Sequence, residues 1–150
     1  MSLFPYLFIG VGGTGGKTIG LIHYHLQQSL RRVGIYDMPL GWQFVHIDVA
    51  AHVDVRSPGL KYDLDASSYV PLTTTQTTYV GLDTQISQTL SARGRDRYLA
   101  WESWRPFLPT DVPVQHPGDG AGQYRTVGRV AAQAELAKIA DAVKRALNAI

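Results

Sequence analysis

The pattern of apolar and polar positions predicts a strand, a helix and a second strand in the first third of the chain. An apolar run rich in aromatic residues spans Leu3 to Ile9, and a second apolar run from Phe44 to Ile47 ends at Asp48. Between them lies one stripe of apolar positions spaced three or four residues apart: Ile19, Ile22, Leu26, Leu30 and Val33. Gly34 follows where a helix-ending glycine belongs. This order predicts a βαβ unit whose first strand is buried between two helical layers.

The remainder of the chain contains fewer regular patterns. The threonine-rich stretch before Leu82 favours an edge hairpin or a surface loop, and residues 84–105 predict a helix in two pieces interrupted by Gly94. Apolar positions with a helical period predict one long helix from about Thr126 to Ala149, with Thr126 as its N-cap. Together these elements predict an α/β fold, a three-layer Rossmann-like domain with a mostly parallel sheet.

Composition and charge exclude several classes of protein. The 150 residues suit one domain, and the formal net charge of +2 does not predict nucleic acid or a membrane surface as a partner. The chain contains no cysteine, and its apolar start is too short for a membrane span and lacks the flanks of a signal peptide. We therefore expect a cytoplasmic protein.

A glycine-rich segment directly follows the first predicted strand. It reads Gly10-Val11-Gly12-Gly13-Thr14-Gly15-Gly16-Lys17 and precedes the first predicted helix. Backbone N–H groups at a helix N-terminus attract anions, and glycine allows the positive φ angles and the close approach that a phosphate group needs. One tight turn needs fewer glycines than this segment contains, which favours a phosphate-binding site.

Two common phosphate-binding motifs fit this segment only in part. Gly10, Gly12 and Gly15 have the dinucleotide-binding spacing, but the acidic candidate Asp48 lies farther away than the roughly 20 residues that are usual. Gly16-Lys17-Thr18 ends like a mononucleotide P-loop, whereas the residue five positions before Gly16 is Val11 and not glycine. A Rossmann-type domain that binds NAD(P) or FAD remains an alternative.

A second glycine-rich segment, residues 118–123, directly precedes the last predicted helix. It reads Gly118-Asp119-Gly120-Ala121-Gly122-Gln123. Two glycine segments that each open a helix can hold the two ends of one triphosphate.

The two segments together resemble the tubulin/FtsZ family of GTPases. Residues 9–17 are similar to the first phosphate loop of its bacterial members, IGVGGGGGN, and residues 120–132 are similar to their later segment GAG…VG…AA. The run from Phe44 to Asp48 occupies the place of the second strand of the family. The resemblance implies an N-terminal portion of a tubulin-like nucleotide-binding domain over residues 1–150, which binds GTP or GDP with Mg²⁺ carried by the nucleotide.

The resemblance also implies which residues contact the nucleotide. The first segment would contact the α- and β-phosphates and the second would approach the γ-phosphate, while Asp48 would hold a magnesium-bound water. The residues implied by the resemblance are Gly12, Gly13, Thr14, Gly15, Gly16, Gly120, Ala121, Gly122 and Gln123. We add Lys17 and Arg125, whose positive charges lie next to the two glycine segments, and Asp48, which replaces the usual aspartate. The resemblance further implies self-assembly or a tubulin-like partner.

The sequence departs from the family pattern in three places. Lys17 replaces an asparagine, and Asp48 lies two residues before the position of the usual aspartate. The family signature GGGTGTG is absent, so we expect a piece of a longer protein that does not hydrolyse GTP alone. A diverged interaction module without turnover is a further alternative.

The histidines do not predict a metal site. Because His23 and His25 are two residues apart on a predicted helix, they point to different faces. The spacing of His46, His52 and His116 does not match a ligand pattern, so we interpret all five as ordinary core or surface histidines.

Overall fold

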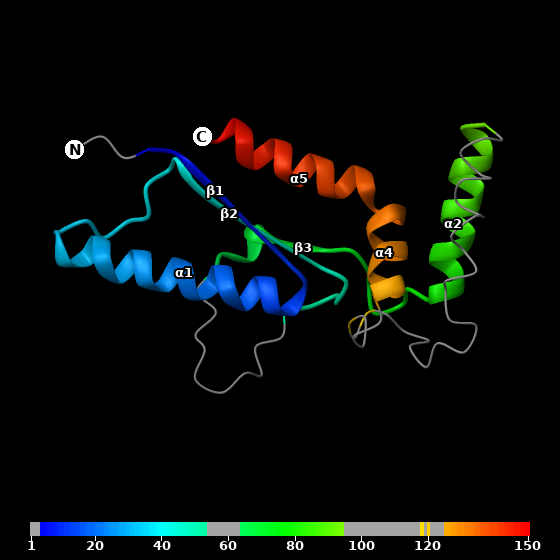
Figure 1. Cartoon of the computed structure of the whole chain (residues 1–150), viewed down its shortest axis with the longest axis horizontal. Coiled ribbons are helices and arrows are strands. Elements are labelled where there is room, and N and C mark those ends of the chain that lie inside the picture. Colours follow the sequence, from blue (N-terminus) through cyan, green and yellow to red (C-terminus); the bar gives the residue numbers. More distant parts are fainter. Residues whose placement is uncertain (1–3, 54–63, 95–117, 119, 121–124) are drawn as a thin grey trace. The chain divides into compact units, whose positions relative to one another are not determined.

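The computed structural model describes residues 4–53, 64–94, 118, 120 and 125–150, which are coloured in Figure 1. The chain divides into two compact units. The first unit comprises residues 1–48, 53–70 and 137–150, and the second comprises residues 49–52 and 71–136.

The first unit contains a βαβ arrangement, as the sequence predicts. Strand β1 (Tyr6–Val11) leads into helix α1 (Gly12–Arg32), which is followed by strand β2 (Trp42–Asp48). The two strands pair in parallel, from Tyr6 opposite Trp42 to Val11 opposite Ile47. A 3₁₀ turn, η1 (Ala66–Ser68), precedes the short strand β3 (Tyr69–Pro71), and the sheet has the order β1-β2-β3.

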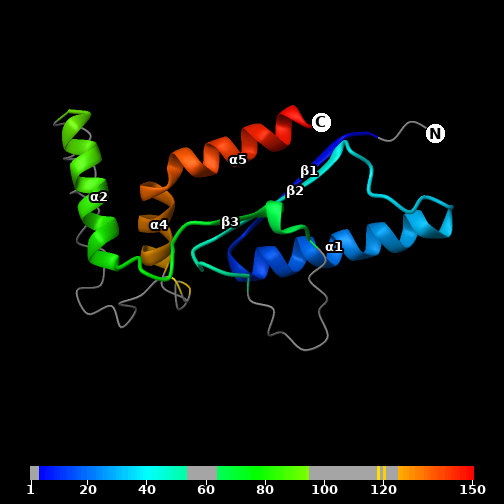
Figure 2. The same ribbon diagram turned by 180° about the vertical axis from the view of Figure 1, so that it is seen from behind.

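Helices cover both faces of this sheet. Phe44 packs toward α1, in a core with Ile19 and Leu64. On the other face, Val45 lies near Ala142 and Ala146 of helix α5 (Leu136–Asn148). Both views show α1 and α5 on opposite sides of the strands (Figures 1 and 2). The three-layer α/β Rossmann-like prediction is therefore confirmed.

Gly34, which the sequence identifies as a helix-ending glycine, follows the end of α1 at Arg32. Gly34 has a φ of 81°, and its N–H donates to the carbonyl of Arg31. The N–H of Ile35 donates to the carbonyl of Leu30, which completes a Schellman motif. The left-handed conformation explains why glycine stands at this position.

The prediction that β1 is buried between two layers is wrong. Ile9 is 44% exposed and Val11 is 70% exposed. Among the described residues, β1 forms an edge of the sheet, and α5 lies near Val45 of the neighbouring strand. An apolar run alone does not distinguish a central strand from an edge strand.

The second unit contains two packed helices. They are α2 (Tyr79–Ala92) and α4 (Arg125–Ala134), and Ile86, Val127 and Val130 are almost completely buried in this unit. The Thr78 hydroxyl caps α2 by accepting from the Gly81 N–H.

The helical piece expected before Gly94 is present, although it begins at Tyr79 rather than at residue 84. Helix α2 ends at Ala92, and Gly94 has a φ of 114°. The second helical piece expected beyond Gly94, with Tyr98, Trp101 and Trp104, lies outside the described residues.

The prediction of one long helix from Thr126 to Ala149 is also wrong. Helix α4 ends at Ala134 and α5 begins at Leu136, and Thr126 is the second residue of α4 rather than its N-cap. The buried faces of α4 and α5 belong to different compact units. Ala131 and Ala142 are eleven residues apart, about three helical turns, so the apolar period continues across the break and conceals it.

Candidate phosphate-binding site

The first glycine-rich segment spans the end of β1 and the beginning of α1, with no separate loop between them. The helix starts at Gly12, which has a φ of 70° and follows the extended residue Val11. The side chain of Val11 does not cap the helix, and the first turn of α1 contains no acidic residue. The first N–H groups of a helix have no partners within the helix, and this end carries a partial positive charge. The N-terminus of α1 can therefore bind an anion.

Three glycines are needed for packing inside the first unit. A Cβ atom on Gly10 would lie 2.5 Å from the carbonyl oxygen of Gly15, so these two residues let the strand and the helix approach each other. A Cβ atom on Gly16 would overlap the imidazole ring of His46. Any side chain at Gly16 would displace the imidazole ring.

The other two glycines face open space. A Cβ atom on Gly12 would have no described residue within 4 Å, although its positive φ favours glycine. Within the described part of the chain, a Cβ atom on Gly13 would meet only the Oδ2 atom of Asp48, at 3.9 Å. Packing among the described residues does not require glycine at position 13, and the exposed space in front of it is available to a ligand.

His46 is a site residue that the sequence analysis interprets only as an ordinary histidine. It is 3% exposed, and its Nε2 atom lies 3.1 Å from the carbonyl oxygen of Gly12. Because a carbonyl oxygen only accepts, Nε2 must carry a hydrogen and donate. Strand alternation places His46 on the same face as Asp48, two residues before the end of β2, and this signal could have identified it.

The surroundings of His46 disfavour its charged form. Burial lowers the pKa of His46, while its hydrogen bond to Gly12 and the nearby Asp48 carboxylate raise that pKa by less. The Oδ2 atom of Asp48 lies 3.8 Å from Nε2. The buried ring is thus predominantly a neutral hydrogen-bond donor near neutral pH.

Asp48 places a carboxylate next to the N-terminus of α1. It is half-buried at the carboxyl end of β2, with Oδ2 close to Gly13. A carboxylate repels a bare phosphate, but its oxygen is a ligand that suits Mg²⁺ or a water bound to Mg²⁺. Among the described residues, no group of three or more His, Cys, Asp or Glu side chains could hold a metal ion. A metal ion here would need further oxygen ligands from the nucleotide and water.

The second glycine-rich segment belongs to the second unit. Gly118 is buried, and its carbonyl oxygen accepts from the N–H of Ala51 at 2.8 Å. A Cβ atom on Gly118 would lie 2.6 Å from the carbonyl oxygen of Thr74, so close packing requires glycine there. Gly120 has a φ of 111°, and Arg125 is the exposed first residue of α4.

The predicted site residues thus fall into three groups. Those of the first unit are Gly12, Gly13, Thr14, Gly15, Gly16 and Lys17, in the first two turns of α1, with Asp48 near Gly13. Gly120 and Arg125 belong to the second unit. Ala121, Gly122 and Gln123 lie outside the described residues.

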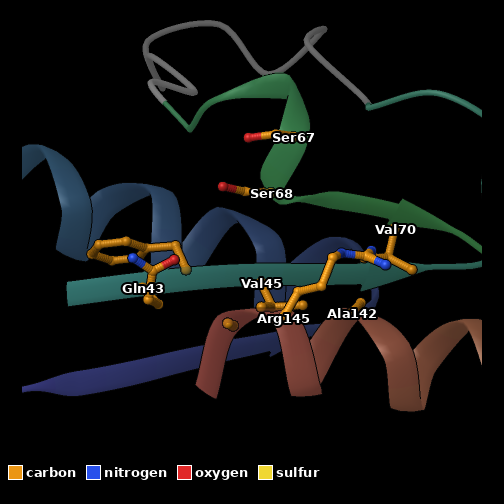
Figure 3. A pocket seen from close by; sticks show the side chains of 9 residues that line it. Gln43, Val45, Ser67, Ser68, Val70, Ala142 and Arg145 are labelled. Carbon is orange, nitrogen blue, oxygen red and sulfur yellow. The ribbon is translucent and has the colours of Figure 1, made fainter. Parts of the chain in front are cut away.

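The first unit also contains a pocket away from this site. The pocket lies beside β2, between η1 and α5, and includes Gln43, Ser67, Ser68 and Arg145 (Figure 3). None of the predicted site residues is among the described residues that line it.

Comparison with known proteins identifies the family. A family model described as tubulin like matches residues 7–150, so the chain belongs to the tubulin-like family. No curated protein and no solved structure matches the chain. Within the described residues, no helix is both long enough and apolar enough to cross a membrane.

The different roles of Gly13 and Gly16 predict opposite effects of the same substitution. Gly16→Ala should destabilise the fold by about 1–3 kcal/mol because its Cβ overlaps the His46 ring. Gly13→Ala should be neutral or stabilise the fold by up to about 1 kcal/mol, since alanine favours a helix. Denaturant unfolding of both variants measures this difference. Equal losses of stability in the two variants would contradict the conclusion that only Gly16 is needed for packing.

The lowered pKa of His46 predicts a loss of stability in acid. The unfolded chain gains a proton on this histidine near its ordinary pKa of about 6.5, whereas the folded chain does so only at lower pH. The effect of His46 on the free energy of unfolding should be constant above about pH 6.5. Below that pH the free energy of unfolding should decrease. The thermal midpoint of the unmodified protein should therefore fall more between about pH 7.5 and pH 5.5 than that of His46→Gln. If the thermal midpoints of the two proteins fell equally over this pH range, the lowering of the His46 pKa would be contradicted.

Proposed function

We propose that the chain binds a magnesium-complexed guanine nucleotide, with its phosphates at the N-terminus of α1. The observation that carries the proposal is the open space at Gly13, bounded by an uncapped helix N-terminus and by the Asp48 carboxylate. The N–H groups of residues 12–14, at the start of the helix, supply donors for the α- and β-phosphates, and Gly15 and Gly16 let the backbone approach them. The residues that would approach the γ-phosphate are Gly120, Ala121, Gly122, Gln123 and Arg125.

Each glycine segment is attached to residues that are close to Asp48 in the sequence. In the first unit, Gly12 and Gly16 contact His46 near the end of β2. In the second unit, Gly118 is hydrogen-bonded to Ala51, and Gly128 faces Val49. Val49 directly follows Asp48, so the polypeptide links the two attachments over a few residues.

Membership of the tubulin-like family favours GTP or GDP over other nucleotides and favours self-assembly with further tubulin-like chains. We propose that residues 1–150 form the N-terminal portion of a nucleotide-binding domain. This portion binds the nucleotide without hydrolysing it alone, because it contains no GGGTGTG segment.

A dinucleotide cofactor is the second candidate, because Asp48 ends the strand beside β1, where Rossmann domains place the acidic residue that binds ribose. In this structure the Asp48 carboxylate lies next to the phosphate-binding turn itself. That position suits a phosphate-bound cation better than a ribose hydroxyl group.

Titration with fluorescent GTP, ATP and NADH in the presence of Mg²⁺ tests the proposal. We expect saturable binding of GTP, which unlabelled GTP displaces and NADH does not. Gly13→Leu should abolish binding because its side chain fills the phosphate position, while Ser29→Leu on the exposed part of α1 should not change it. Both variants should retain the thermal midpoint of the unmodified protein.

Three outcomes would contradict the proposal. Binding of NADH alone would favour the dinucleotide alternative, and the absence of any nucleotide binding would favour an interaction module. Unchanged GTP affinity in Gly13→Leu would place the ligand elsewhere.

Asp48→Asn tests the role of the carboxylate. In EDTA the variant should bind GTP more tightly than the unmodified protein, because the substitution removes a negative charge beside the phosphates. With Mg²⁺ it should bind GTP more weakly, because asparagine is a poorer ligand for the ion or its water. A change of the same sign under both conditions would contradict this role.

A further inference from the structure

We propose that His46 is a positioning residue of the phosphate-binding turn, which aims the N–H of Gly13 at the ligand. This inference rests on the proposed function, since it assigns a role in the same site. His46 itself is buried and does not contact the ligand.

The hydrogen bond from His46 acts on one particular peptide group. The carbonyl of Gly12 and the N–H of Gly13 belong to the same planar trans peptide, so they point in opposite directions. Nε2 of His46 holds that carbonyl oxygen at 3.1 Å from the buried side. The N–H of Gly13 is therefore turned away from His46, toward the exposed side of the turn.

The ring itself is held in place by its neighbours. Gly16 lies against the imidazole so closely that no Cβ could be inserted, and the ring of Tyr69 packs edge-on with a centroid distance of 5.0 Å. Asp48 Oδ2 lies 3.8 Å from the same Nε2 atom. A buried ring with these contacts presents its N–H in one direction.

The peptide that His46 holds has little other restraint from side chains. Both of its residues are glycines, and Gly12 already has a positive φ. Glycine pairs rotate their shared peptide easily. The Gly12 carbonyl also faces the N–H of Gly16 in the first turn of α1. Without the His46 donor the peptide would therefore tilt, and the N–H of Gly13 would no longer be aimed at the ligand.

Two substitutions separate the hydrogen bond from the packing of the ring. His46→Phe keeps an aromatic ring under Gly16 but removes the donor, and it should weaken GTP binding by about tenfold or more. His46→Gln supplies an amide N–H at the reach of Nε2 and should bind GTP within about threefold of the unmodified protein. Thermal unfolding of both variants verifies that they are folded.

The results separate this inference from the proposed function. If the unmodified protein binds no nucleotide, the proposed function fails and this role fails with it. If it binds GTP and His46→Phe binds equally tightly, only the positioning role is overturned. Weak binding by both variants, without rescue by glutamine, would also overturn it.

A spectroscopic measurement tests the hydrogen bond without any substitution. In the protein labelled with ¹⁵N-histidine, His46 at neutral pH should be the tautomer with hydrogen on Nε2. A hydrogen on Nδ1 alone would overturn the inference, because Nε2 could not then donate to Gly12.

Discussion

The close contact between Gly16 and His46 is the constraint on which the site depends. It lets the first turns of α1 lie directly against the end of β2, and the pair Gly10 and Gly15 does the same for β1. A helix normally stands off from a sheet by the length of its side chains. Here the glycines have no side chain, so the helix lies directly against the strands. Each glycine in the helix lowers its stability by about 1 kcal/mol relative to alanine. The result is a helix N-terminus beside a strand-end carboxylate.

The segment that directly follows Asp48 in the chain belongs to the second unit. The residues after Asp48 hold the second glycine segment through the hydrogen bond between Ala51 and Gly118. Within the second unit, Thr73 donates a hydrogen bond to the carbonyl of Val49, which fixes this short segment further. Nucleotide-binding α/β proteins typically bind ligands at the carboxyl ends of their strands. The tubulin-like family assignment agrees with this interpretation.

The sequence predicts the local elements well because their signals are local. The stripe from Ile19 to Val33 and the cap at Gly34 define α1, and the apolar run at Phe44 defines β2. The exposure of Ile9 depends on which elements cover β1, and the break in the helix at Glu135 depends on packing in two separate units. The periodicity of apolar residues contains neither kind of information. The glycines are visible in the sequence, but their separate roles depend on the position of His46, which only the folded chain reveals.

The central claim is that both glycine segments bind one polyphosphate, and the backbone amides of the glycines report on it directly. NMR spectra of protein labelled with ¹⁵N-glycine would be recorded during a titration with Mg²⁺ and GTP. We expect the amide signals of Gly13 and Gly16 and those of Gly120 and Gly122 to shift with one common dissociation constant. A shift confined to one of the two segments, or two different dissociation constants, would contradict the account.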